Sequence, residues 1–344
     1  MQYFAGANTR RGFKSIFDEC FKGVGRIFIL KGSSGCGKST LMKRVASAAE
    51  ARGLECDVIR CSADPESLDG VIVKQLSAAV VDGTAPHIMD VKYPCVRESI
   101  VNLGQFWDES MLLPHREQII ALTDGKAYAY ADAYRCLAAK GTAYDLLNGI
   151  LNRAVMRERL DHAVIETAKR LGGKGFGKRR LLFSTAFSSE GVTVLPTFGD
   201  VKRVEKVSGE AASIFMSALF QTVNELDYAC VVSLSHFDAE TPDAIYFEES
   251  DTLVTSLESP QCASFESERK ISCGCFTDGS VIASHRARIR ALSKLMQESE
   301  AQSREQLARA RVLHGELERI YIPAMDFKAL DRQTDVLIKG IFGE

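Results

Sequence analysis

The sequence lacks an excess of charge of either sign: 43 lysines and arginines stand against 45 aspartates and glutamates, and the net charge is −2. This balance gives no global indication of nucleic-acid binding, for which a strongly basic domain is typical. The sequence also lacks any apolar run near the roughly 18 residues that a membrane helix requires. Residues 1–8 do not resemble a signal peptide, because no basic segment leads into an apolar one. We therefore expect a cytoplasmic protein without membrane or nucleic-acid partners.

The ten cysteines lack the spacing of a metal site or of a disulfide framework. Only Cys273 and Cys275 stand close together, with no second pair and no His-x-x-x-His partner, which is weak support for zinc. Free thiols in a reducing compartment are the more typical interpretation for a chain of 344 residues. That length corresponds to about two domains.

What the sequence does contain is the phosphate-binding pattern G-x-x-x-x-G-K-[ST]. Glycines permit backbone angles that a Cβ forbids, so successive N–H groups can turn toward a phosphate. Lys38 is expected to reach the β- and γ-phosphates of a nucleotide, and the Ser39 hydroxyl to ligate Mg²⁺. The predicted nucleotide-binding residues are Gly32, Ser33, Ser34, Gly35, Cys36, Gly37, Lys38, Ser39 and Thr40.

The flanking segments support this loop. An apolar run over 27–30 predicts a buried strand before it, and apolar residues at helical spacing over 41–49 predict a helix after it, whose N-terminus would favour a phosphate. Beside Lys38 and this helix, the thiolate of Cys36 would be favoured. The alternative is that Cys36 only fills a variable position. The motif Asn-Lys-x-Asp, which recognises guanine, is missing from the chain, so ATP is favoured over GTP.

Three further residues are candidates for the site. Asp82 ends the apolar run 78–81 and is expected to hold Mg²⁺ opposite Ser39, although an Asp that caps a turn before Gly83 is the alternative. Asp64 could orient an attacking water or a substrate hydroxyl, as could Asp69 with less support. His87 could sense the γ-phosphate, or it could be a buried, hydrogen-bonded histidine. With Lys38, the predicted catalytic residues are Asp64 and His87.

The chain contains an internal repeat. Residues 204–260 align with 30–86 without a gap, 274–286 align with 104–116, and 183–191 align with 4–12. Such a pattern predicts a tandem duplication. We place an N-terminal domain at 1–172, a glycine-rich linker at 173–180 and a C-terminal domain at 181–344.

The second copy has lost the residues that the chemistry needs. The ungapped alignment puts Lys206, Ala211 and Ala212 at the positions of Gly32, Gly37 and Lys38, and Ser256 at the position of Asp82. The second domain is therefore predicted to keep the fold without a nucleotide site.

The predicted fold class is α/β, with two tandem phosphate-loop domains. Alternating strands and helices favour a largely parallel sheet with flanking helices in each. Helical segments near 115–171 and 285–341 predict an antiparallel helical hairpin appended to each core. Arg157, Arg159, Lys169 and Arg170 form a solvated helix face in the simplest interpretation. An arginine that reaches the nucleotide is the alternative.

Several motifs together resemble a poorly characterised bacterial family of tandem phosphate-loop proteins, described as ATPases or ATP-binding proteins. They are Phe4-Ala5-Gly6-Ala7, Ile29-Leu30-Lys31-Gly32 with the loop that follows, Asp64-Pro65-Glu66-Ser67-Leu68-Asp69-Gly70, Asp82-Gly83-Thr84-Ala85-Pro86-His87 and Asn102-Leu103-Gly104-Gln105-Phe106-Trp107-Asp108. The resemblance covers the whole chain and is strongest over residues 1–110. It implies ATP binding. In that family both copies can carry a phosphate loop, and the second copy here departs from that pattern.

The sequence thus predicts a Mg²⁺-dependent ATP-binding protein, a slow ATPase with one competent site. No Glu follows Asp82, so the water-activating residue of many ATPases is missing there. A phosphotransferase acting on a small molecule is one alternative. The other is a non-catalytic, nucleotide-regulated module that binds a protein partner through its helical hairpins or its second domain.

Overall fold

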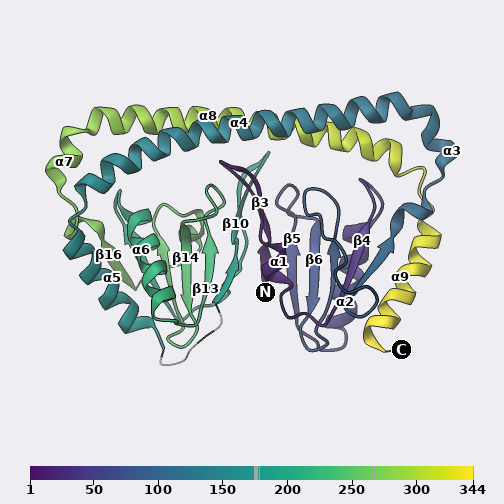
Figure 1. Cartoon of the computed structure of the whole chain (residues 1–344), viewed down its shortest axis with the longest axis horizontal. Coiled ribbons are helices and arrows are strands. Elements are labelled where there is room, and N and C mark those ends of the chain that lie inside the picture. Colours follow the sequence, from purple (N-terminus) through teal and green to yellow (C-terminus); the bar gives the residue numbers. More distant parts are fainter. Residues whose placement is uncertain (174–176, 178, 267, 344) are drawn as a thin grey trace.

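The computed structural model describes residues 1–173, 177, 179–266 and 268–343 and contains two α/β units bridged by two long helices (Figure 1). Each unit is built on a six-stranded mixed sheet. The α/β class and the two tandem units are thereby confirmed. None of the helices in these ranges combines the length and the apolar character needed to cross a bilayer.

The first domain contains six strands, in the spatial order β1 (Gln2–Phe4), β5 (Cys56–Arg60), β6 (Leu68–Val73), β7 (Ala78–Asp82), β4 (Arg26–Lys31) and β8 (Glu98–Asn102). β6 runs antiparallel to β5 and β7, whereas the other neighbours are parallel. The connections on either side of β6 span only 61–67 and 74–77, too short for the crossover that parallel neighbours require. The sheet is therefore mixed rather than largely parallel.

The second domain repeats this arrangement in the order β9 (Arg179–Leu182), β13 (Cys230–Leu234), β14 (Pro242–Phe247), β15 (Thr252–Ser256), β12 (Arg203–Ser208) and β16 (Arg269–Ser272). Its strand directions match those of the first domain pair by pair. A hairpin accompanies each sheet: β2 (Gly6–Thr9) with β3 (Gly12–Ser15), and β10 (Thr185–Ser188) with β11 (Gly191–Val194). The shared topology agrees with the predicted internal repeat.

The strand registers correct one part of the sequence alignment. Leu30 of β4 pairs with Asp82 of β7, and Val207 of β12 pairs with Ser256 of β15. Because Ser256 matches Asp82, Val207 occupies the place of Leu30, and Gly209 rather than Lys206 occupies the place of Gly32. The loop after β4 spans 32–37, but the loop after β12 spans only 209–211. The second loop is therefore three residues shorter than the first, besides the differences in residue type.

Each sheet is covered by one principal helix of its own half. α2 (Lys38–Glu50) follows β4, and α6 (Ala212–Glu225) follows β12. The buried side of α2 consists of Leu41, Met42, Val45 and Ala49, at the helical spacing that the sequence predicts. The shorter helices are α1 (Phe17–Cys20), α3 (Glu109–Leu112) and α7 (Gly279–Ser284), with 3₁₀ turns at Leu103–Phe106, Leu113–His115, Pro260–Ser264 and Cys273–Cys275.

The C-terminal helices of the two halves are exchanged. α4 (Arg116–Ala154) runs antiparallel to α8 (Arg286–Tyr321) above both sheets (Figure 1). α4 ends over the second domain, where α5 (Arg157–Leu171) packs against α6, and α8 ends over the first domain, where α9 (Phe327–Phe342) packs against α2. The predicted hairpins are not seen, because each long helix pairs with the other long helix instead of with the short helix that follows it.

Buried side chains hold these exchanged helices in place. Leu330 and Leu337 of α9 share an apolar cluster with Leu41 and Val45 of α2. The equivalent cluster in the second domain joins α5 to α6. Between the long helices, Leu137 of α4 lies in one cluster with Leu307 of α8. Apolar burial of this kind stabilises the crossed arrangement.

Reciprocal hydrogen bonds give the halves an approximate twofold relation. The Asp108 N–H donates to the Ala324 carbonyl at 2.7 Å, and the Asp278 N–H donates to the Ala154 carbonyl at 2.7 Å. Near the centre, the N–H groups of Phe4 and Phe183 each donate to the other residue's carbonyl. A contact that repeats itself in both directions is typical of a twofold interface.

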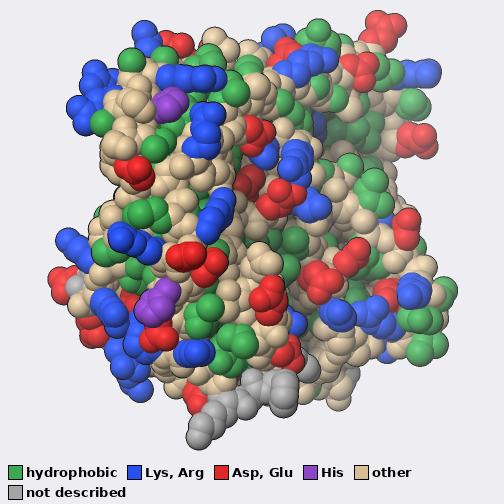
Figure 2. All heavy atoms as spheres, turned by 60° about the vertical axis from the view of Figure 1, so that its left-hand side comes forward, with side chains coloured by type: hydrophobic (Ala, Val, Ile, Leu, Met, Phe, Trp, Pro, Cys, Tyr) green, Lys and Arg blue, Asp and Glu red, His purple; other side chains and the backbone are tan. Residues whose placement is uncertain are grey.

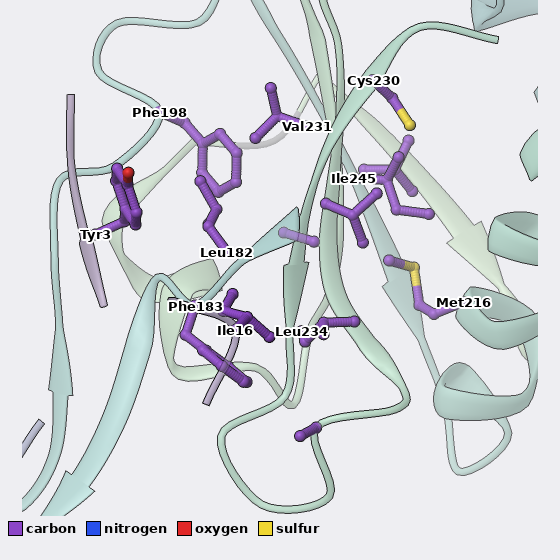
Figure 3. Close-up of a cluster of buried hydrophobic side chains, with 14 of the residues drawn as sticks. Tyr3, Ile16, Leu182, Phe183, Phe198, Met216, Cys230, Val231, Leu234 and Ile245 are labelled. Atoms are coloured by element: carbon purple, nitrogen blue, oxygen red, sulfur yellow. The ribbon is translucent and has the colours of Figure 1, made fainter. Parts of the chain in front are cut away.

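The largest apolar cluster crosses this central contact. Tyr3 and Ile16 of the first domain lie near Leu182, Phe183 and Phe198 of the second in Figure 3. The two domains therefore share one buried core at their junction. On the outside, acidic and basic side chains are interspersed over the face that Figure 2 shows.

Cutting the chain between its halves should leave them associated. The predicted linker, 173–180, lies partly outside the described residues, and both α5 before it and β9 after it lie at the second domain. A protease site inserted at 173–178 is expected to give two fragments that co-elute at the volume of the uncut protein in size-exclusion chromatography. The same cut in a Leu307→Asp variant should weaken the association, because it places an unpaired charge in the α4–α8 contact. Separate elution of the unmutated fragments would contradict the helix exchange.

Candidate nucleotide site

The loop between β4 and α2 has the backbone shape that its glycines permit. Gly35 has φ of 71° and Gly37 has φ of 82°, both in the left-handed region that L residues rarely adopt. Gly37 is also the residue that caps α2, so the first turn of this helix directs its free N–H groups at the loop. A loop of this kind can surround an anion with backbone N–H groups.

The exchanged helices press on the same loop. A Cβ built on Gly35 would lie 2.8 Å from Ile322 Cγ1, and one built on Gly37 would lie 2.7 Å from Leu330 Cδ2. Both glycines are thus required by packing as well as by backbone angle. These two contacts come from the other half, from the residue that follows α8 and from α9.

Lys38 is folded back into the loop. Its Nζ donates to the Ser33 carbonyl at 2.9 Å and to the Gly32 carbonyl at 3.2 Å, and it lies 3.6 Å from Asp82 Oδ2. The Lys38 side chain is only 14 % exposed. The ammonium therefore already occupies the loop that would receive a phosphate.

Asp82 lies at the end of β7, the parallel neighbour of β4. One carboxylate oxygen, Oδ1, accepts from the Thr84 N–H at 2.9 Å and from its hydroxyl at 2.6 Å. The other, Oδ2, faces Lys38. Burial raises the pKa of Asp82, and the charge of Lys38 acts in the opposite direction. Asp82 thus caps the turn and faces the loop at once, so the two alternatives for this residue are compatible.

The donor set at this point fits Mg²⁺. The Ser39 hydroxyl accepts from the Leu68 N–H at 3.0 Å, at the start of β6, and Asp82 adds carboxylate oxygen. Among the described residues, no group of three or more His, Cys, Asp or Glu side chains could form a metal cage. Mg²⁺ in nucleotide sites needs no such cage, because it takes one or two protein oxygens and completes its shell with phosphates and water.

Cys36 is not the activated thiol that its neighbours in sequence suggest. The side chain is buried, and burial raises its pKa despite the nearby charge of Lys38. A Cβ on Gly32 would lie 2.5 Å from the Cys36 sulfur. Cys36 therefore fills space beneath the loop as a neutral thiol.

Asp64 serves a turn in the structure. Its carboxylate accepts from the Ser67 hydroxyl at 2.6 Å, and its carbonyl accepts from the Ser67 N–H at 2.8 Å. The counterpart Asp238 in the second domain accepts from the N–H groups of Glu240 and Thr241. A turn role common to both copies explains why this Asp persists without the lysine. The catalytic role of Asp64 stays a prediction.

His87 is buried between aromatic rings. Its Nε2 lies 3.0 Å from Asp69 Oδ2, Phe17 stacks on the imidazole, and Phe13 meets it edge-on. His87 and Asp69 are 7 % and 5 % exposed. This position favours the alternative of a hydrogen-bonded core histidine over a γ-phosphate sensor.

Three titratable groups that the sequence did not assign to the site come from the long helices. His314 of α8 places Nδ1 3.3 Å from the Ser34 hydroxyl and Nε2 3.4 Å from Glu318. Burial, followed by the positive charge of Lys126, lowers the pKa of His314. Lys126 belongs to α4, and burial together with the charge of Lys38 lowers its pKa. The basic residues of α5 point elsewhere: this helix packs on the second domain, where Arg170 pairs with Glu205.

The second domain has a pocket beside α6 with one charged side chain in its wall, Arg157 of α5. A cavity of about 290 Å³ opens there, lined by residues of α4, α5, α6 and the loop after β13. Tyr144, Asn148 and Ser213 lie on its wall, without a phosphate lysine. Ala212 begins α6 where Lys38 begins α2. The prediction that the second domain lacks the same nucleotide site remains consistent with this geometry.

The buried carboxyl Asp243 should make stability depend on pH. Burial, and then the neighbouring Asp238, raises its pKa to about 7. Since the unfolded value is near 3.8, the unfolded chain releases its proton first, and stability falls as pH rises from about 4 to about 7. Asp243→Asn is expected to raise the midpoint of thermal unfolding at pH 8 by several degrees and to flatten its pH dependence.

The matched control is Asp69→Asn at the equivalent position of the first domain. Asp69 is paired with His87, so its amide variant should lower the unfolding midpoint instead. Differential scanning calorimetry from pH 5 to pH 8 measures both. An Asp243→Asn variant as pH-dependent as the wild type would contradict a raised pKa at this carboxyl.

Comparisons with known proteins supply no assignment. Neither the protein-family models, nor the curated proteins, nor the solved structures searched contain a significant match to this chain. The residues of the loop and the helices that surround it are therefore the features that bear on function.

Proposed function

We propose that the chain binds ATP with Mg²⁺ at the loop 32–40 and hydrolyses it slowly. The observation that carries this proposal is the position of Lys38. Its ammonium lies among the loop carbonyls, 3.6 Å from Asp82, at the first residue of a helix capped by a left-handed glycine. The resemblance to tandem phosphate-loop ATPases agrees with it.

In this proposal each group has one task. The loop N–H groups and the N-terminus of α2 bind the phosphates, and Lys38 leaves the Gly32 and Ser33 carbonyls to contact the β- and γ-phosphates. Ser39 and Asp82 would hold Mg²⁺, which neutralises phosphate charge when bound. Asp64 stands near the site, since its charge acts on His314 and Arg311. It remains the candidate for orienting water, and the missing Glu beside Asp82 makes hydrolysis slow.

The helix exchange favours a second candidate function. Ile322, the residue after α8, and Leu330 of α9 lie against the loop, and α8 begins at the second domain. A nucleotide that moved these contacts would bias how the two domains sit against each other. The alternative is thus a nucleotide-regulated interaction module in which turnover is not required.

Removing the loop lysine should weaken nucleotide binding strongly. Lys38→Ala deletes a charged hydrogen-bond donor to the phosphates, which is worth roughly 1.5–3 kcal/mol, or about ten- to a hundredfold in affinity. Isothermal titration calorimetry with ATP and Mg²⁺, and a free-phosphate assay, follow binding and hydrolysis. Lys43→Ala, an exposed lysine on the same helix, is the control and should behave as the wild type. A wild type that binds no ATP would refute the proposal, and binding without phosphate release would favour the module.

The number of bound nucleotides tests the asymmetry between the domains. The short loop 209–211 and Ala212 leave the second domain without the amides and the lysine that hold phosphate. Native mass spectrometry at saturating ATP should show one nucleotide per chain. Two per chain would contradict a single competent site.

A further inference from the structure

The approximate twofold relation shows which residues of α4 and α8 correspond. Val155 forms a bridge with Thr277, and Trp107 forms the equivalent bridge with Met325. Val155 after α4 therefore matches Met325 after α8. Counted back from these anchors, Lys126 matches Met296, Tyr144 matches His314, and Asn148 matches Glu318.

At five matched positions the complete loop has Lys, His, Asp or Glu side chains and the shortened loop has none, whereas at a sixth the order is reversed, with Arg157 in the second domain and Phe327 beside Gly37 in the first. The complete loop has Lys126, His314 and Glu318 from the long helices, besides Lys38 and Asp82. The shortened loop has uncharged residues at all five places: Met296, Tyr144, Asn148, Ala212 and Ser256. The five positions at the complete loop lie on α2, β7, α4 and α8, and the matching five lie on α6, β15, α8 and α4. If Lys126 served only to pack α4 against α8, an uncharged residue such as the matching Met296 would serve equally well at this position.

Lys126 lies beside the segment of α8 that contacts the loop. It follows Gly125, whose added Cβ would lie 3.4 Å from Leu313 Cδ1, and Leu313 precedes the His314 that contacts Ser34. Lys126 is half-buried and makes no hydrogen bond or ion pair to any part of the chain that the structure describes. Lys38 is the charge that acts on it most strongly. Lys38 repels the ammonium of Lys126 and Glu318 attracts it, and a phosphate bound near both ammonium groups would offset their repulsion.

We propose that Lys126 is a second phosphate-binding cation, which extends from α4 across the loop to the terminal phosphate of bound ATP. This inference depends on the proposed function, because it assigns a further contact at the same site. Lys38 spans the β- and γ-phosphates, so a second ammonium on the open side of the loop adds its charge mainly at the γ-phosphate. Lys126 thereby makes the site prefer a triphosphate to a diphosphate. It also makes α4, which continues to the second domain, sense which nucleotide is bound.

The decisive measurement compares ATP with ADP. Lys126→Met installs the residue of the matching position in α8, keeps a long apolar side chain, and removes the charge. Titration calorimetry should show ATP affinity weakened about tenfold or more, the scale of one lost charged hydrogen bond, while ADP affinity changes less than about twofold. Lys126→Arg should keep the preference for ATP. Lys294→Met, at an exposed lysine of α8, should leave both affinities unchanged.

The outcomes separate this inference from the proposed function. If the wild type binds ATP and Lys126→Met binds it equally well, the second cation is refuted and the loop site stands. If Lys126→Met weakens the binding of ATP and of ADP equally, a role at the terminal phosphate is refuted. It is also refuted if Lys126→Arg does not keep the preference for ATP. If the wild type binds no nucleotide, both proposals fail. Thermal unfolding of each variant, compared with the wild type, shows whether an affinity loss comes from a folding defect.

Discussion

The structure depends on the antiparallel packing of α4 against α8. This contact places each long helix over the domain of the other half, and α5 and α9 then dock on sheets to which they are not adjacent in sequence. Because Ile322 and Leu330 reach Gly35 and Gly37 through this route, the first loop is shaped by both ends of the chain. The first half alone therefore lacks part of the surroundings of its own loop.

Much of the site could be predicted from short stretches of sequence, since local rules govern it. The glycines at 35 and 37 need left-handed backbone, Lys38 starts a helix, and Asp82 ends the strand beside the loop. The two-domain α/β class also follows from local patterns and from the repeat. The mixed sheet was less predictable, because apolar strands of similar composition pair in either direction and only the short connections around β6 decide between them.

Other features could not be predicted, because they depend on contacts far apart in the chain. An amphipathic helix such as α5 has an apolar stripe that fits its own sheet or an equivalent sheet equally well. No local sequence pattern therefore shows which of the two sheets the helix covers. His314 and Glu318 join the site only through the helix exchange, because α8 begins at the second domain. The three-residue difference between the loops could not be predicted for a related reason. The residues after the two loops align without a gap, and the same alignment extends back over the loops and the strands before them. Only the strand registers show which residues of β4 and β12 correspond.

The shortened loop also limits what evolution could recover in the second domain. Changing Ala212 to lysine would supply an ammonium at the start of α6, yet loop 209–211 would still have too few N–H groups to surround a phosphate. Substitutions occur one at a time and are reversible, whereas regaining three residues in frame at one position is a rare event. No single substitution would therefore give the second domain a loop with the geometry of the first.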